Sequence, residues 1–200
     1  GDYIFNGADD NGSGSSGVLE LAEAFAKNPV KPKRSILFAL WTAEERGLLG
    51  SRYYVENPYV PMEKTAACLN LDMISRTWDK EKLIKTGRIW GTKIPQETLE
   101  KINIEKFLVS SIDKSSQVMY DTVKDCNRFV GMSLYLRKSE GGGGSDHAPF
   151  AYKKIPWISF FGAMTDDYHT PKDSIEKVSF DLLQSVTRLA YLTAFTIADK

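Results

Sequence analysis

Two adjacent carboxylates end a run of apolar residues in the segment ILFALWTAEERGLLGS, residues 36–51. Glu44 and Glu45 follow the run directly, and a Gly-containing helix signal comes next. Two like charges at the edge of an apolar layer disfavour each other's ionised form unless a positive group lies beside them. A bound cation is such a group, whereas the solvated first turn of a helix is the simpler explanation for the pair taken alone.

Three further segments carry residues that bind cations. Asp10 lies in the Gly/Ser-rich segment GADDNGSG, Asp72 closes an apolar run, and His169 lies in DYHTPKD. Each also has a purely structural explanation, since Asp caps helices and turns and a lone His is common in loops. Carboxylate oxygens combined with imidazole suit zinc, or less often manganese or cobalt. A metal site therefore requires that the fold brings these remote residues together.

The elements between these residues alternate between strand and helix patterns. Continuous apolar runs of strand length predict buried strands, and apolar residues at helical spacing predict helices. We expect strands over 34–43, 65–75, 132–138 and 155–163, and helices over 15–28, 45–57, 96–108, 115–130 and 179–199. This alternation predicts a three-layer α/β/α domain with a largely parallel central sheet. Ligands of such sheets bind beyond the carboxyl ends of the strands, which is where Glu44, Asp72 and His169 fall.

The bulk composition fits one globular domain and disfavours some classes of partner. The 200 residues contain 26 Lys and Arg against 26 Asp and Glu without a basic block, so nucleic acid is not expected as a main partner. No apolar run approaches the roughly 20 residues that a membrane-spanning helix needs. We expect a single domain over residues 1–200.

Five motifs give this pattern a recognisable form. GADDNGSG, AEERGLLGS, NLDM, SDHAPF and DYHTPKD occur in this order, between Gly7 and Lys177. With them the chain resembles the co-catalytic zinc aminopeptidase family, di-zinc exopeptidases related to glutamate carboxypeptidase, transferrin receptor and glutaminyl cyclase. The resemblance implies the phosphorylase/hydrolase-like zinc peptidase fold, a three-layer sandwich around a mixed, mostly parallel sheet, with two zinc ions as cofactors.

The resemblance also implies a role for each residue of the set. Asp10 matches the carboxylate that bridges the two zinc ions, and the peptide bond after it is often cis in the family. Glu45 and His169 match ligands of one zinc, and Asp72 matches a ligand of the other. Glu44 matches the general base, which takes a proton from the metal-bridging water and does not itself bind metal. This division of roles explains why two glutamates stand side by side.

One ligand of the family is absent from this sequence. Relatives carry a His in an H-x-D motif upstream of the GADDN loop, and the two histidines here are His147 and His169. We therefore expect an N-terminally truncated family domain, in which the second zinc has only Asp10 and Asp72 and binds weakly or not at all. Four alternatives are open for His147: it completes that site, it faces substrate, it contacts a metal ligand without binding the metal, or it lies on the surface. Asp173 is expected either to orient His169 through its other ring nitrogen or to cap the following turn.

The resulting hypothesis is a metal-dependent exopeptidase, an aminopeptidase that hydrolyses N-terminal residues from peptide substrates. The alternatives are a glutaminyl cyclase-like acyltransferase and a non-catalytic domain that kept the fold and lost the metals. The joint presence of the acidic residues and His169 favours an enzyme. Relatives are commonly exported, so the resemblance also implies an extracytoplasmic location, secreted or periplasmic.

Overall fold

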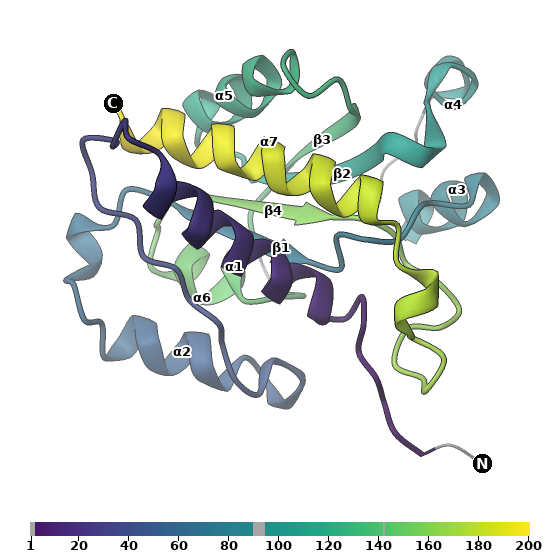
Figure 1. The fold of residues 1–200 in the computed structure, drawn as a ribbon, viewed down its shortest axis with the longest axis horizontal. Helices are drawn as coiled ribbons and strands as arrows, with labels where there is room; N and C mark the ends of the chain where they lie inside the picture. The colour runs from purple at the N-terminus through teal and green to yellow at the C-terminus, as the bar shows by residue number, and fades with distance from the viewer. Residues whose placement is uncertain (1–2, 90–94, 142) are drawn as a thin grey trace.

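A four-stranded mixed sheet forms the centre of the protein. The computed structural model describes residues 3–89, 95–141 and 143–200 (Figure 1). The strands, in the spatial order β1-β4-β2-β3, are β1 (Cys68–Asp72), β2 (Phe107–Asp113), β3 (Ser133–Ser139) and β4 (Trp157–Phe161). β1 is parallel to β4, β2 is parallel to β3, and β4 is antiparallel to β2. The expected mixed, mostly parallel sheet is thereby confirmed.

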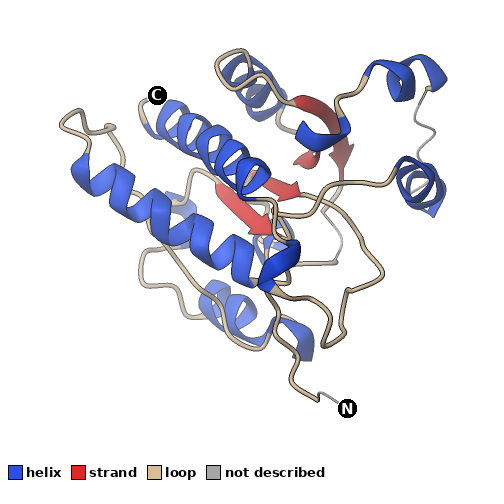
Figure 2. Cartoon of the chain, turned by 45° about the vertical axis from the view of Figure 1, so that its right-hand side comes forward, coloured by secondary structure: helices blue, strands red, loops and turns tan. Residues whose placement is uncertain are grey.

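Helices cover both faces of this sheet and complete the three layers. One face carries α1 (Gly12–Lys27), α5 (Gln117–Asn127) and α7 (Phe180–Ala198), with α1 running beside α7 (Figures 1 and 2). The other face carries α2 (Leu49–Glu56), α3 (Lys80–Ile89), α4 (Gln96–Lys101) and α6 (His147–Tyr152). Within the described residues, no helix combines the length and the apolar character that crossing a membrane requires.

The alternation of side chains along the strands divides the core in two. On β2, Leu108 and Ile112 pack toward α5 and α7, whereas Phe107 and Val109 pack toward α3 and α4. All four side chains are at most 1% exposed. A strand covered on both faces carries apolar residues on each side of its pleat, because each side faces a buried layer.

Most of the predicted elements are confirmed. The predicted strands over 65–75, 132–138 and 155–163 correspond to β1, β3 and β4. The predicted helices over 15–28, 115–130 and 179–199 correspond to α1, α5 and α7. α1 begins at Gly12 because the side chain of Asn11 accepts a hydrogen bond from the Gly14 N–H and caps the helix.

The strand predicted over 34–43 is wrong in this structure. None of these residues joins the described sheet, in which β1 is the outermost strand on that side. Leu37 is 62% exposed and Leu40 is 55% exposed, so the segment is not a doubly covered central strand. An apolar run indicates a tendency to be buried, whereas strand formation also needs an adjacent strand whose backbone pairs with it.

Two predicted helices also differ from the structure. The helix over 45–57 is divided into a 3₁₀ turn, Glu44–Arg46, and α2, because Gly47 and Leu48 have φ angles of 97° and 62°. The helix over 96–108 ends with α4 at Lys101, and β2 begins at Phe107. Tertiary burial overrides helix propensity there, since β2 fills the middle of the sheet. The helices α3 and α6 were not anticipated.

We expect Ile158→Ala to lower the free energy of unfolding by about 2–5 kcal/mol, because Ile158 on β4 is fully buried and its truncation leaves a cavity in the core. Leu19→Ala is the matched control, since Leu19 is 61% exposed on α1 and its expected change stays within about 0.5 kcal/mol. Urea denaturation followed by circular dichroism measures both. Equal losses in the two variants would contradict this placement of the core.

Candidate metal centre

The loop before α1 delivers Asp10 to the carboxyl end of β1. The peptide bond between Asp10 and Asn11 is cis, as the family resemblance implied. The side chain of Asn11 accepts a hydrogen bond from the Met73 N–H at 3.1 Å and donates one to the Leu71 carbonyl at 3.0 Å. Because these two groups flank Asp72, Asn11 docks the start of α1 onto the end of β1.

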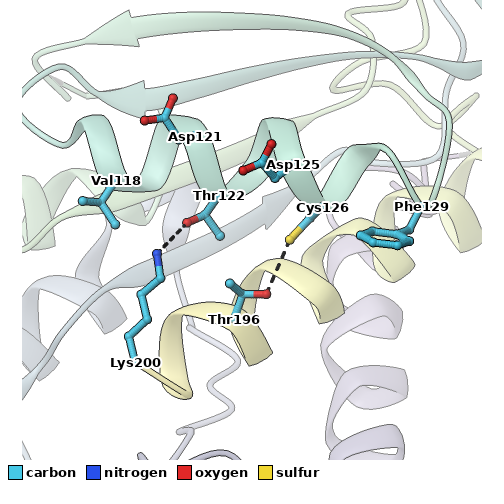
Figure 3. Close-up of a pocket in the computed structure, with 8 residues that line it drawn as sticks. All are labelled: Val118, Asp121, Thr122, Asp125, Cys126, Phe129, Thr196 and Lys200. Carbon is cyan, nitrogen blue, oxygen red and sulfur yellow. Dashed lines mark hydrogen bonds between the residues drawn. The ribbon is translucent and has the colours of Figure 1, made fainter.

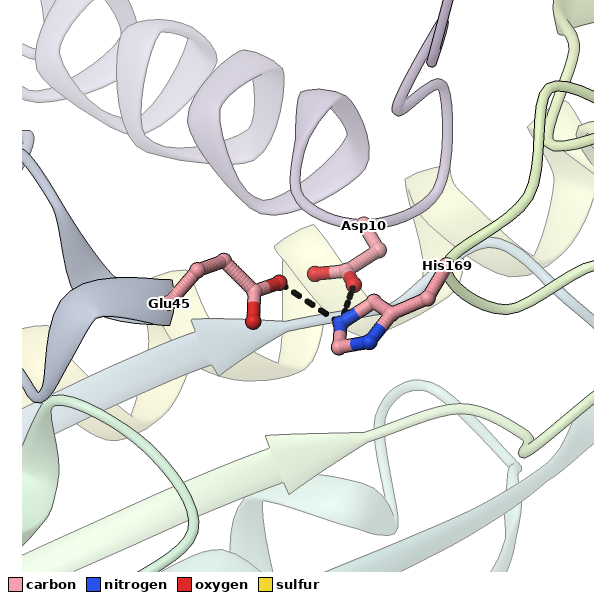
Figure 4. A group of neighbouring side chains, drawn as sticks. All are labelled: Asp10, Glu45 and His169. Carbon is pink, nitrogen blue, oxygen red and sulfur yellow. Dashed lines mark hydrogen bonds and ion pairs between the residues drawn. The ribbon is translucent and has the colours of Figure 1, made fainter.

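Three remote residues meet at one point in front of this strand end. His169 Nε2 lies 2.7 Å from Glu45 Oε1 and 3.2 Å from Asp10 Oδ2, and all three ligand atoms lie within 4.8 Å of one another (Figure 4). Glu45 comes from the 3₁₀ turn Glu44–Arg46, and His169 comes from the loop that follows β4. Two carboxylates and one imidazole nitrogen, supplied by three separate segments, therefore converge as the sequence predicted.

This group fits a zinc ion that keeps one coordination position free of protein ligands. Catalytic zinc sites take three protein ligands from His, Asp and Glu and leave a further position for water or substrate. The Asp10 side chain is 15% exposed, whereas the Glu45 and His169 side chains are 56% and 46% exposed. The group is thus anchored in the protein at Asp10 and accessible to solvent at its other two members.

Asp72 lies close enough to repel Asp10 but is not part of this three-residue group. Its Oδ2 accepts a hydrogen bond of 2.5 Å from Ser145 Oγ, which in turn accepts one of 2.7 Å from Asn70 Nδ2. Among the described residues, the group whose ligand atoms lie within 4.8 Å comprises Asp10, Glu45 and His169. The structure therefore brings together three of the four predicted ligands and holds the fourth nearby.

A cavity of about 920 Å³ connects these carboxylates. Its acidic lining consists of Asp10, Glu44, Glu45, Asp72 and Asp146. Burial, followed by repulsion from Asp72 and Glu45, raises the pKa of Glu44 to about 7. Burial and the same kind of repulsion raise the pKa of Asp10 to about 7 and that of Asp72 to about 6. The cavity therefore presents a cluster of mutually repelling carboxylates, which a divalent cation would relieve.

His147 lies outside both the three-residue group and the lining of this cavity. Its ring packs on Trp157 with 4.4 Å between ring centroids, and it is 7% exposed. Burial and the charge of Arg137 lower the pKa of His147 to about 4. The surface alternative for His147 is therefore wrong, and the structure does not bring it to the metal group or to the cavity as a substrate-facing residue.

Asp173 makes a different contact from either of the two expected ones. Its carboxylate accepts hydrogen bonds from the backbone N–H groups of Asp9 and Asp10, at distances of 2.9–3.1 Å. The expectation that it orients His169 or caps the following turn is corrected accordingly. The reason is tertiary, since the loop carrying Asp173 folds back onto the loop before α1.

Asp146 is a cavity residue that the sequence analysis did not single out. Its Oδ1 accepts a hydrogen bond of 2.5 Å from Ser51 Oγ, and burial raises its pKa. It adds repulsion to both Glu44 and Asp72. The SDHAPF motif could have indicated this carboxylate, because Asp146 directly precedes His147.

A second cavity, of about 480 Å³, lies between α5 and α7 (Figure 3). Within it Lys200 Nζ donates a hydrogen bond of 3.2 Å to Thr122 Oγ1, and Cys126 Sγ lies 3.6 Å from Thr196 Oγ1. None of the candidate metal ligands lines it. Asp10, Glu45 and Asp72 line the first cavity instead.

Fold and site together define an α/β/α domain of the zinc-peptidase type. The chain belongs to Peptidase family M28, whose model matches residues 1–194. It is 29% identical to aminopeptidase YwaD of Bacillus subtilis over 202 residues, covering 97% of this chain and 38% of that protein. It is 33% identical to leupeptin-inactivating enzyme 1 of Streptomyces exfoliatus over 152 residues, covering 75% of this chain and 28% of that protein. The chain thus spans well under half the length of these relatives.

Solved structures agree with this fold. The zinc aminopeptidase BSAP of Bacillus subtilis matches with a TM-score of 0.72 at 28% identity, covering 97% of this chain and 43% of that one. A glutaminyl cyclase from an Acidobacteriales bacterium matches with a TM-score of 0.62 at 20% identity, covering 98% of this chain and 64% of that one. At that identity the second likeness concerns the fold alone.

The raised pKa of Glu44 gives a pH prediction for the metal-free protein. An acid whose pKa is higher in the folded than in the unfolded chain binds more protons when folded, so its contribution to stability falls as pH rises between about 4.5 and 7. We expect Glu44→Gln to become progressively more stable than the wild type as pH is raised from 5 to 8. Thermal unfolding in the presence of a chelator measures the difference.

The exposed Glu23, whose pKa is lowered by Lys27, is the control for this prediction. Its ionised form is favoured by folding, so its contribution changes only below about pH 4.5, and the difference between Glu23→Gln and the wild type should stay constant between pH 5 and 8. A constant difference between Glu44→Gln and the wild type at all pH values would contradict the crowding of carboxylates at Glu44.

Proposed function

We propose that this chain is the metal-binding part of a zinc-dependent aminopeptidase, which hydrolyses N-terminal residues from peptides. The observation that carries the proposal is the convergence of Asp10, Glu45 and His169, with Glu44 lining the same cavity as Asp10 and Glu45. Membership of Peptidase family M28 and the names of the similar proteins support it. The complete activity belongs to a protein of the length of its relatives.

Each residue of the site has a distinct part in the proposed reaction. Asp10, Glu45 and His169 would hold the zinc, and Glu44 would act as the general base. When bound, zinc supplies the positive charge that polarises the scissile carbonyl and makes a water molecule more acidic. Glu44 accepts the proton of the attacking water and delivers it to the leaving amine, a transfer that needs a carboxylate not engaged with metal.

The number of metal ions follows from the available ligands. One zinc has the three-residue group of Asp10, Glu45 and His169. Of the predicted ligands, a second zinc sharing Asp10 would have Asp72 besides it, fewer than the three protein ligands of a usual catalytic zinc. We propose that this chain by itself holds one zinc firmly, in keeping with the absence of the H-x-D histidine. An extracytoplasmic location belongs to the same proposal and rests on the family resemblance.

Calorimetric titration of the metal-free protein with zinc is expected to give one tight equivalent. His169→Ala should weaken the binding at least about tenfold, because it leaves two carboxylates as the remaining members of the group. Asp121→Asn is the control, since it changes a carboxylate in the second cavity and should leave the affinity unchanged. Two tight equivalents in the wild type would contradict the one-ion proposal.

Glu44→Gln should lower kcat for an aminoacyl-p-nitroanilide by roughly 10²–10⁴-fold while the zinc content stays that of the wild type, because the amide cannot accept a proton. Glu56→Gln, at an exposed residue paired with Lys153, serves as the control and should be fully active. Cyclisation of a glutaminyl peptide, measured in parallel, is expected to be absent. Full peptidase activity in Glu44→Gln would remove Glu44 as the base, and cyclisation without peptide hydrolysis would favour the acyltransferase alternative.

A further inference from the structure

Asp173 connects the loop that carries His169 to the loop that carries Asp10. It lies four residues beyond His169 and is 4% exposed. Its Oδ2 accepts hydrogen bonds from the backbone N–H groups of Asp9 at 3.0 Å and Asp10 at 2.9 Å, and its Oδ1 lies 3.1 Å from the Asp9 nitrogen. Its backbone carbonyl accepts a further hydrogen bond from the Ala8 N–H at 3.1 Å. One residue therefore holds three consecutive N–H groups that end at Asp10.

A third segment fixes Asp173 from its other side. Arg76 Nη1 lies 3.7 Å from Asp173 Oδ1, and Arg76 Nη2 contacts Asp167 Oδ2 at 2.5 Å. Lys177 Nζ lies 2.7 Å from the other oxygen of Asp167. Arg76 follows β1 and has a side chain that is only 11% exposed, so its position is defined by packing as well as by charge. The loop after β4 is thus tied both to the end of β1 and to the start of α1.

We propose that Asp173 is a positioning residue that sets the spacing between Asp10 and His169 by hydrogen bonding to the backbone of the Asp10 loop. The inference rests on the proposed metal site, to which Asp10 and His169 both belong. The Asp10 side chain leaves the backbone at the residue whose N–H is held, so the hydrogen bond restricts where its carboxylate can lie. Charge-assisted hydrogen bonds to backbone N–H groups are stronger than neutral ones, and this one is shielded from solvent. A preformed ligand spacing raises metal affinity because less ordering is needed on binding.

Two substitutions at Asp173 separate hydrogen bonding from charge. Asp173→Ala removes both oxygens and should raise the zinc dissociation constant about 10–100-fold, measured by competition with a chromophoric chelator. Asp173→Asn keeps one oxygen, which in the place of Oδ2 accepts from both Asp9 and Asp10 N–H groups. It should therefore recover part of the wild-type affinity, because the hydrogen bonds remain but lack the charge of a carboxylate. An Asn variant as weak as the Ala variant would overturn the hydrogen-bonding role in favour of charge.

Asn127→Ala is the matched control for a merely structural role. The Asn127 side chain also bonds backbone groups of a loop, accepting from the Met132 N–H at 3.0 Å and donating to the Met132 carbonyl at 2.8 Å. It lies at the end of α5 and does not line the metal cavity. Asn127→Ala should lower the melting temperature without changing the zinc dissociation constant. If folded Asp173→Ala behaves in the same way, the proposal is overturned.

Amide hydrogen exchange in the metal-free protein tests the contact without zinc. The Asp10 N–H should exchange about tenfold faster or more in Asp173→Ala than in the wild type, because it loses a buried charged acceptor. Equal exchange rates would overturn the positioning role. Failure of the wild type to bind zinc would instead overturn the proposed function, so the two failures are distinguishable.

Discussion

Mutual repulsion between carboxylates is the constraint on which this site depends. Glu44, Asp72 and Asp10 share one cavity, and burial together with their neighbours raises the pKa of each. Several carboxylates gathered in a partly buried cavity destabilise one another's ionised form unless a positive charge lies beside them. His169 lies between Asp10 and Glu45, and a divalent cation bound by these three residues would supply positive charge there.

The backbone around these residues adopts positive φ angles, which residues other than glycine seldom adopt. Ala43 precedes Glu44 with a φ of 55°, Met73 follows Asp72 with a φ of 53°, and His169 itself has a φ of 56°. Such conformations persist only where the surroundings hold them, and they cluster at functional sites. At Met73 the holding contact is visible, because its N–H donates to the Asn11 side chain. The site is therefore held by neighbouring loops as much as by the strands.

The mixed sheet decides which loops take part. β1 and β4 are adjacent and parallel, so the ends after Asp72 and after Phe161 lie at the same edge. β2 is antiparallel to β4, so the end of β2 after Asp113 lies at the opposite edge, and so does that of β3. Among the described residues, the three-residue group comes from the loop that follows β4 and from two segments that dock beside the end of β1.

The residue types of the site and most of its framework could be predicted from the sequence. The motifs and their order were enough to select Asp10, Glu45 and His169. The strand-end argument holds for Asp72 and His169, because β1 and β4 are parallel neighbours, whereas the strand predicted before Glu45 does not form. Long helices such as α1 and α7 could also be predicted, since their apolar spacing and their caps are local properties of the sequence.

How these residues are held depends on tertiary contacts that the sequence did not predict. It placed Asp173 on the backbone of Asp10, turned His147 toward Trp157 and added Asp146 to the cavity. It also left residues 34–43 outside the sheet, although their apolar run reads as a strand. Sequence patterns report the tendency of a segment to be buried or to turn. Pairing partners and contacts between loops depend on which remote segments arrive at the same place, and no local pattern encodes that.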